Sequence, residues 1–347
     1  MERLAGITSL ATYFPTEVRT NGWWVERYPE LVKDAQTRAL ARVFSQDGEP
    51  TTHFDRAMQP YETDPFRGAK ARRVAGAASA ASLEVAAART ALERRGLAPN
   101  RVDLLISAGF VPERFDVGNA VFVARDLGLR GAAFNLESAC GGPLNAMMTA
   151  AAFINAGVHE RVLVTTSCTY LHRVPPDDTL GWFMGDGAGA MLIERGGARI
   201  VAGHARHTAE TCGTWYHEIE DGRLRMRASK TTGPTMRASA EPQLRACTDG
   251  VLSKAGLALA DIDFFVFHTP TAWFADFAAN ALGVPRDKTV CTYEDYANIG
   301  PALTTANLHR AASRGRLRSG DRVLVFGPGS AASSAAVVLE WGDVAIS

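Results

Sequence analysis

The sequence predicts an α/β fold made of two similar βαβαβ halves stacked face to face. Three observations support this class. Helix-then-strand segments recur at a period of about 160 residues, the candidate strands are short and wholly apolar, and glycine-rich turns stand at corresponding places in both halves. Wholly apolar strands are typical of a sheet that helices cover on both faces. We place the two halves at 1–198 and 199–347.

The first repeated segment is a helix that ends at a glycine and is followed by a buried strand. It reads ALERRGLAPNRVDLLISAG around Gly96 and VLSKAGLALADIDFFVFHT around Gly256. Glycine is favoured just past the last helical turn because it enters the left-handed region without steric strain. Asp103 and Asp263 stand at the same distance after the two glycines. The match in spacing indicates one structural unit used twice.

The second repeated segment is a turn that opens a helix. Residues 139–143 (ACGGP) stand opposite residues 297–301 (ANIGP), and an alanine-rich stretch follows each. The strand starts at Arg161 and Arg322 keep nearly the same offset, and glycine-rich turns at 185–194 and 327–340 each run into an apolar strand. A pseudo-twofold axis would bring equivalent strand-to-helix turns together, so we expect Cys140 and Asn298 to face one another.

A histidine is predicted at the same crevice. His268 ends the apolar run 264–267, at the position equivalent to Ala108 of the first half. Functional groups of α/β folds gather where strands end. We therefore expect Cys140, His268 and Asn298 to meet at one crevice.

Composition excludes several classes of protein. Apolar residues make up 46% and charged residues 21% of the 347, which is ordinary globular composition. Lysine plus arginine equals aspartate plus glutamate at 37 each, with no basic run suited to a nucleic acid. Neither a signal peptide nor a long apolar span is indicated, so we expect no membrane association and a cytoplasmic location.

The five cysteines stand singly, which argues against a disulfide framework and leaves Cys140 free to act as a nucleophile. His204, His207, Cys212 and His217 lie near one another in sequence, but their spacing matches no standard zinc pattern. We read this stretch as a polar connecting segment and predict no metal.

The order of Cys140, His268 and Asn298 resembles the Cys-His-Asn set of ketoacyl synthase III, within the thiolase superfamily. Four motifs extend the resemblance over most of the chain: ATYFPTEVRTN (11–21), NLESACGGPLNA (135–146), MGDGAGAMLIE (184–194) and FGPGSAASSAAVVLEW (326–341). The resemblance implies a homodimer with the five-layered αβαβα thiolase fold. It also implies acyl-CoA or acyl carrier protein as substrate, and no permanently bound cofactor.

The resemblance also implies a role for each residue. Cys140 would carry the acyl group, and a helix starting near residue 142 would lower the pKa of its thiol. His268 and Asn298 would hold the malonyl thioester carbonyl during decarboxylation. The backbone N–H groups of Cys140 and Gly329 would form the oxyanion hole. We read the glycines of 185–189 as packing under the Cys140 turn.

The entrance to the site is predicted by analogy with the family. The loop at 110–120 would line the tunnel or reach across the dimer through Phe110, Glu113, Phe115 and Asp116. Lys70, Arg72 and Arg73 form a basic group that would attract phosphopantetheine or an acidic carrier protein, with a solvated face as an equal alternative.

The chain departs from the family pattern at several positions. A longer stretch runs through 26–71, and the residues around His268 (HTPT) and Asn298 (ANIG) differ from the usual ones. Decarboxylative condensation with a malonyl thioester, in secondary metabolism, is our first expectation. The alternatives are direct acyl transfer to a hydroxyl or amine of a small-molecule acceptor, a thioester hydrolase, and a non-catalytic partner subunit. Retention of Cys140 and His268 argues against the last.

Overall fold

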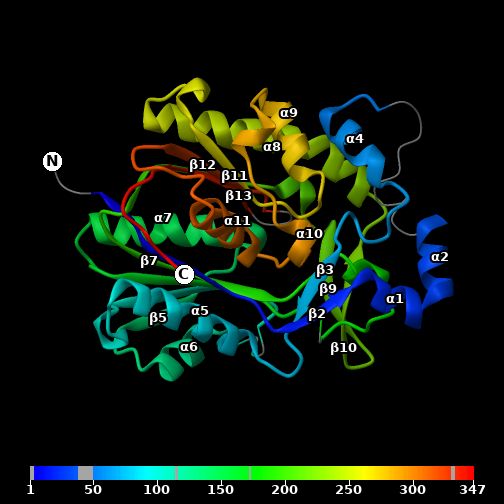
Figure 1. The fold of residues 1–347 in the computed structure, drawn as a ribbon, viewed down its shortest axis with the longest axis horizontal. Coiled ribbons are helices and arrows are strands. Elements are labelled where there is room, and N and C mark those ends of the chain that lie inside the picture. Colours follow the sequence, from blue (N-terminus) through cyan, green and yellow to red (C-terminus); the bar gives the residue numbers. More distant parts are fainter. Residues whose placement is uncertain (1–3, 38–49, 113, 115, 172, 330–332) are drawn as a thin grey trace.

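The computed structural model describes residues 4–37, 50–112, 114, 116–171, 173–329 and 333–347. Helices and strands alternate in layers around one large mixed sheet (Figure 1). None of the helices in these ranges is long and apolar enough to cross a membrane.

Each half of the chain supplies one part of the sheet. The strands follow the order β11-β12-β13-β8-β1-β7-β6-β4-β5, and β14 also pairs with β1. The first half gives β1 (Ala5–Tyr13), β4 (Leu104–Phe110), β5 (Ala132–Asn135), β6 (Val162–Cys168) and β7 (Gly187–Arg195). The second half gives β8 (Ala198–His207), β11 (Phe264–Phe267), β12 (Arg322–Gly327), β13 (Ser333–Glu340) and β14 (Ala345–Ile346).

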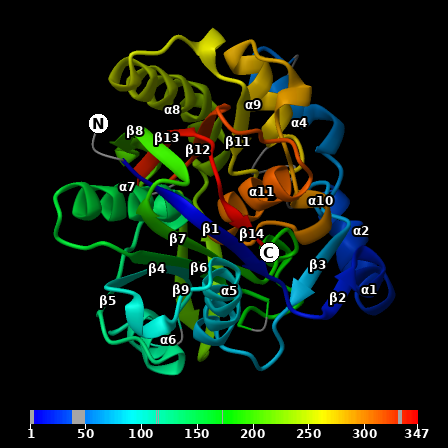
Figure 2. The same cartoon turned by 60° about the vertical axis from the view of Figure 1, so that its left-hand side comes forward.

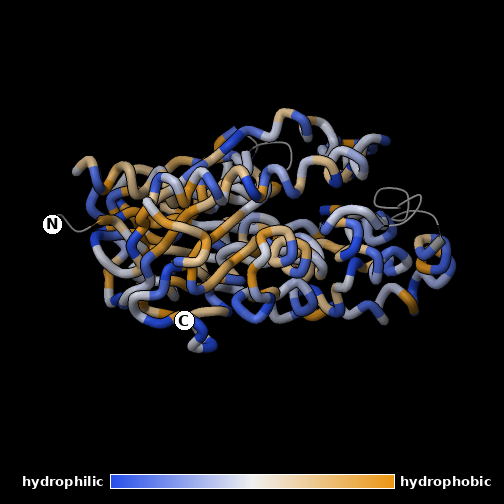
Figure 3. The backbone as a smooth tube through the Cα atoms, turned by 90° about the horizontal axis from the view of Figure 1, so that it is seen from above, coloured by the Kyte–Doolittle hydropathy of each residue, from blue (hydrophilic) through white to orange (hydrophobic). Residues whose placement is uncertain are grey.

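The first-half strands and the second-half strands form two layers that are joined where β1 pairs with β8, and the helices complete the order α-β-α-β-α. Helices α5 (Ala80–Arg95) and α6 (Ala120–Leu127) cover the outer face of the first-half strands, and α8 (Thr232–Ala255) and α9 (Phe274–Leu282) cover the second-half strands. Between them lie α7 (Gly142–Asn155) and α11 (Ala302–Ser313), each in contact with strands of both halves (Figure 2). Apolar segments gather inside this body, while hydrophilic ones run along its outside (Figure 3).

The predicted duplication is confirmed in detail. Helices α5 and α8 end at Gly96 and Gly256, whose φ angles are 67° and 66°. The Asp103 carboxylate accepts from the backbone N–H of Arg161 at 2.8 Å, and the Asp263 carboxylate accepts from that of Arg322 at 2.9 Å. Each aspartate thus ties the start of one strand of the sheet to the start of its neighbour. The division of the chain at residues 198 and 199 stays a prediction.

Further elements extend the body at one end (Figure 1). Strand β2 (Glu17–Thr20) pairs with β3 (Ala71–Val74), and α1 (Asn21–Arg27), α2 (Pro29–Thr37) and α4 (His53–Met58) lie between them in sequence. The ribbon of β9 (Trp215–Glu220) and β10 (Arg223–Ala228), and the short helix α10 (Tyr293–Tyr296), belong to the second half.

The predicted basic group does not form one face. Lys70 is exposed and pairs with Glu294 at 2.6 Å. Arg72 is fully buried, and its Nε donates to the carbonyl oxygen of Trp182 at 2.8 Å. Neighbouring residues of a strand point to opposite sides, so β3 turns Arg72 inward and its neighbour Arg73 the other way.

Candidate active site

One cavity of about 270 Å³ brings together the three residues of the candidate catalytic set. Cys140 comes from the first half, and His268 and Asn298 come from the second, and all three line its wall. Most of the remaining wall is apolar, with Phe110, Phe183, Met184, Trp215 and Met226 among its members. The spatial meeting expected from the repeat is therefore found.

Cys140 stands on a short 3₁₀ turn, η3 (Ala139–Gly141), that leads directly into α7. Ala139 has a φ of 45°, which is rare for a residue with a side chain and marks local strain. A Cβ on Gly141 would lie 2.2 Å from the carbonyl oxygen of Ser333, so only glycine fits there. The backbone next to the thiol is thus held by close packing against β13.

The electrostatic expectation for Cys140 needs correction. We expected the N-terminus of α7 to lower the pKa of the thiol. In the structure, burial raises this pKa to about 12, because a thiolate loses hydration inside the cavity. The resting side chain is therefore a neutral thiol at neutral pH, and a proton acceptor is needed when it attacks.

His268 follows β11, and its backbone N–H donates to the carbonyl oxygen of Phe326 at 2.8 Å. The side chain is fully buried, and its Nδ1 lies 3.3 Å from the hydroxyl of Thr304. Its Nε2 is also buried and has no hydrogen-bond partner within the described ranges. Burial lowers the pKa of the imidazole to about 3, so the ring is neutral. A neutral imidazole can either donate or accept at Nε2, depending on its tautomer.

Asn298 occupies the turn that mirrors the Cys140 turn. The preceding residue, Ala297, has a φ of 56°, which repeats the strain found before Cys140. The side-chain Oδ1 of Asn298 accepts from the backbone N–H of Gly300 at 2.9 Å. Because the amide group is planar, the Nδ2 donor of Asn298 then points away from the N–H of Gly300.

The glycine-rich turns support the site across the two halves. A Cβ on Gly185 would lie 2.1 Å from the carbonyl oxygen of Tyr296, and the N–H of Gly185 donates to the carbonyl oxygen of Asn298 at 3.0 Å. The first-half glycines thus pack under the Asn298 turn, which corrects the expectation that they lie beneath Cys140. Conversely, Gly327 of the second half abuts the carbonyl oxygen of Cys140.

Of the two backbone N–H groups predicted for the oxyanion hole, that of Gly329 already has a hydrogen-bond partner. The N–H of Gly329 donates to the Oγ of Ser334 at 3.2 Å, and its carbonyl oxygen accepts from Thr208 at 2.6 Å. Ser334 and Pro328 line the cavity. The role of the Cys140 and Gly329 amides stays a prediction, and it requires the Ser334 hydroxyl to give up its bond to Gly329.

The predicted tunnel loop is placed in part. Phe110 lines the cavity, whereas Asp116 is exposed and does not belong to its wall. Glu113 and Phe115 lie outside the described residues. A contact of this loop with a second protomer stays a prediction.

Sequence reasoning missed a histidine in this cavity. His217 lies on β9 and lines the wall, although we read this region as a polar connector. The signal was the alternation of Trp215 and His217 with outward-facing residues, which is the pattern of a half-buried strand. Across the described chain, no three His, Cys, Asp or Glu side chains gather as they would around a metal ion.

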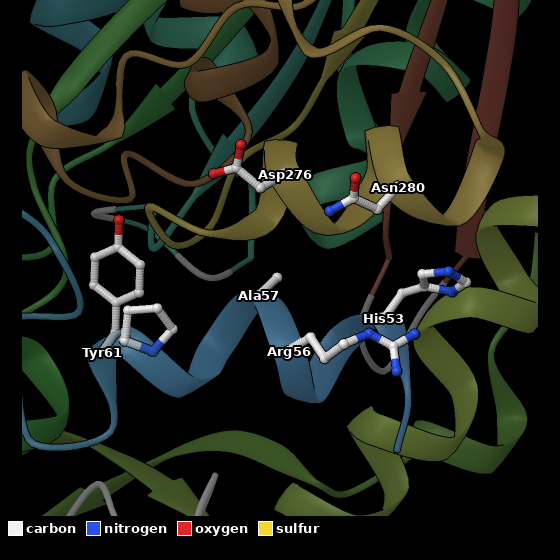
Figure 4. A pocket seen from close by; sticks show the side chains of 7 residues that line it. His53, Arg56, Ala57, Tyr61, Asp276 and Asn280 are labelled. Atoms are coloured by element: carbon white, nitrogen blue, oxygen red, sulfur yellow. The ribbon is translucent and has the colours of Figure 1, made fainter. Parts of the chain in front are cut away.

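A second hollow lies outside this cavity, between α4 and α9 (Figure 4). It is an open groove of about 670 Å³, and Arg56 of α4 and Asp276 of α9 line it. Phe54 of α4 instead contacts Phe277 and lines the Cys140 cavity. Helix α4 therefore separates the two hollows, and the groove shares no lining residue with the candidate site.

Comparisons with known proteins agree with this arrangement. The family model of 3-oxoacyl-[acyl-carrier-protein] synthase III matches residues 134–208, and that of its C-terminal part matches residues 252–341. The β-ketoacyl-[acyl-carrier-protein] synthase III of Rhizobium meliloti is 32% identical over 292 residues, which cover 79% of this chain and 88% of that protein. The protein of the same name from Brucella canis is 31% identical over 290 residues, with the same coverage.

Solved structures show the same fold. The 3-oxoacyl-(acyl carrier protein) synthase III of Pseudomonas aeruginosa matches with a TM-score of 0.80 and 22% identity, over 99% of both chains. OleA of Xanthomonas campestris matches with a TM-score of 0.81 and 21% identity, over 98% of this chain and 99% of that one. These likenesses establish the predicted thiolase fold. The chain belongs to the 3-oxoacyl-[acyl-carrier-protein] synthase III family and is a condensing acyltransferase.

Proposed function

We propose that the protein transfers acyl groups in two steps through Cys140. In the first step, the Cys140 sulfur attacks the carbonyl of an acyl thioester of coenzyme A or a carrier protein. The new thioester bond forms as the old one breaks, and the thiol proton of Cys140 passes to the departing thiolate. The observation that supports this most is the convergence of Cys140, His268 and Asn298 on one cavity.

In the second step, a malonyl thioester loses carbon dioxide and its enolate carbon attacks the acyl carbonyl. A carbon–carbon bond forms, and the Cys140 thiolate leaves and takes up one proton from water. Donors on the thioester oxygen stabilise the enolate in a water-poor site. The buried Nε2 of His268 and the Nδ2 of Asn298 suit this task, since both groups are neutral and the first has no other described partner.

The same geometry supports a proton acceptor for the first step. A thiol whose pKa is raised to about 12 must lose its proton as it attacks. The neutral His268 imidazole can accept that proton when Nδ1 carries the ring N–H, and then return it to the leaving thiolate. In the second step the other tautomer donates from Nε2. We propose that the Thr304 hydroxyl, which can donate or accept at Nδ1, permits both tautomers.

Direct transfer to a hydroxyl or amine is a second candidate. Besides His268, the cavity wall holds Thr271 Oγ1 and Gln243 Oε1, both buried and without a hydrogen-bond partner in the described structure. Such atoms suit an acceptor that carries hydroxyl groups, as in secondary metabolism. His268 would then take the proton of the attacking O–H.

Intact-protein mass spectrometry tests the proposal. The native protein is incubated with short acyl thioesters and compared with Cys140→Ala and with Cys212→Ala, which removes an exposed thiol outside the cavity. We expect an acyl adduct that only Cys140→Ala abolishes. Adding a labelled malonyl thioester should then discharge the adduct with release of labelled carbon dioxide.

Discharge by a hydroxyl or amine mixture, without carbon dioxide release, would favour direct transfer. Discharge by water alone would indicate a hydrolase. Absence of any adduct from any donor would refute acyl transfer through Cys140.

A further inference from the structure

The ribbon of β9 and β10 turns its inner face to the cavity, and this face is apolar except for His217. Trp215, His217 and Met226 all line the wall, and His217 pairs directly with Met226 across the ribbon. The outer face is charged, where Arg227 binds Glu218 at 2.5 Å. The inward position of His217 therefore follows from strand alternation, and a leucine or methionine would suit its apolar neighbours equally well.

The imidazole of His217 is held by aromatic neighbours. Its ring meets Phe110 and Tyr170 edge-on, with ring centroids 5.2 Å and 5.6 Å away. Its Nε2 is buried and lacks a hydrogen-bond partner among the residues described. Buried polar atoms are normally satisfied, so an unpaired one on a residue that lines a cavity is available to a ligand atom. Burial lowers the pKa of His217, which favours a neutral ring and a neutral ligand group.

The position of Phe110 indicates which end of the cavity His217 serves. A Cβ on Gly300 would lie 3.4 Å from the Cβ atoms of Phe110 and Cys168, and Cys168 is fully buried. Phe110 therefore connects the His217 ring to the protein interior beside the Asn298 turn. An acyl chain on Cys140 would extend toward this interior, whereas the thioester carrier must remain connected to solvent.

We infer that His217 determines acyl specificity by hydrogen bonding a hydroxyl or carbonyl oxygen within the acyl chain carried on Cys140. The inference rests on the proposed acylation of Cys140. It assigns the enzyme to oxygen-bearing acyl groups in preference to plain hydrocarbon ones. A site that hydrogen-bonds a substrate oxygen rejects analogues without it, because its own buried atom is then left unpaired.

The test compares acylation rates for matched thioesters. Hexanoyl N-acetylcysteamine is set against its isomers hydroxylated at the third, fourth, fifth or sixth carbon, and Cys140 acylation is followed by quenched intact-protein mass spectrometry. The native protein should favour one hydroxylated isomer over hexanoyl by roughly tenfold or more. His217→Leu should remove this preference and accelerate hexanoyl loading, and His217→Gln should retain part of it. Tyr216→Leu, on the exposed face of the same strand, should leave the preference unchanged.

The outcomes separate the two proposals. If hexanoyl loads on Cys140 and His217→Leu leaves the ratio of the isomers unchanged, the specificity role is overturned while acyl transfer stands. If no thioester loads on the native protein, acyl transfer fails and the specificity role fails with it. Should His217→Leu not fold, as judged by its melting curve, the smaller change of preference in His217→Gln decides the matter.

Discussion

Gly185, in the first half, packs against the turn that carries Asn298 in the second half, and this contact leads to a prediction for Gly185→Ala. The new methyl group would lie 2.1 Å from the carbonyl oxygen of Tyr296. Restoring a normal contact requires the turn that carries Asn298 to move by about 1 Å, and a displacement of that size costs about 100-fold in a positioned reaction. Overpacking should also lower the free energy of unfolding by about 1–3 kcal/mol.

The assay follows the two chemical steps separately. Acyl loading of Cys140 should change little, because its turn is braced by β13 and Gly327, while condensation with a malonyl thioester should fall about 100-fold. Gly22→Ala is the matched control, since its methyl group would meet only the Thr20 hydroxyl, at 3.6 Å. An equal loss in both steps would refute the assignment of Gly185 to the Asn298 turn. So would an unchanged condensation rate.

Three other predictions follow from the buried groups. Because burial raises the pKa of Cys140 to about 12, the rate of its alkylation by iodoacetamide should rise about tenfold per pH unit from pH 7 to 10. A rate that levels off near neutral pH would show that the N-terminus of α7 affects the pKa of the thiol more than burial does. His268→Ala should slow condensation by about 100-fold or more, and it should also slow formation of the acyl adduct, because His268 takes the thiol proton in the first step. Rapid condensation would exclude His268 as the enolate donor. Glu84→Ala should lower the free energy of unfolding, measured by urea denaturation, by about 3 kcal/mol or more. The reason is that the buried Glu84 carboxylate accepts hydrogen bonds from four side chains, those of Ser107, Asn119, Thr165 and Ser167. Glu84→Gln is the control, and a loss below about 1 kcal/mol in Glu84→Ala would contradict this prediction.

The sequence was sufficient to predict how the halves and the three candidate residues come together. The repeat fixes which strand ends are equivalent, and equivalent ends meet at a pseudo-twofold axis. The paired positive φ angles at Ala139 and Ala297 show how closely the two turns correspond.

The features that the sequence analysis predicted wrongly or missed depend on packing in three dimensions, which a sequence pattern does not reveal. Which half supports which turn is decided by contacts across the two halves, so Gly185 was assigned to the wrong turn. The pKa of Cys140 depends on the balance between burial and the helix N-terminus, and only the shape of the cavity settles it. His217 was missed because the charged residues on the outer face of the ribbon made the whole segment look like a polar connector.

Strand β1 has a consequence for how the chain is made. It leaves the ribosome before every other strand of the large sheet, yet it lies inside that sheet, paired with β7, β8 and β14. These partners appear only after residue 186, and Ile346 of β14 pairs with Leu10. A growing chain therefore carries an apolar strand with open edges through most of its synthesis, which favours aggregation and slow closure. Removing β14 should leave β1 exposed along part of one edge even in the finished protein.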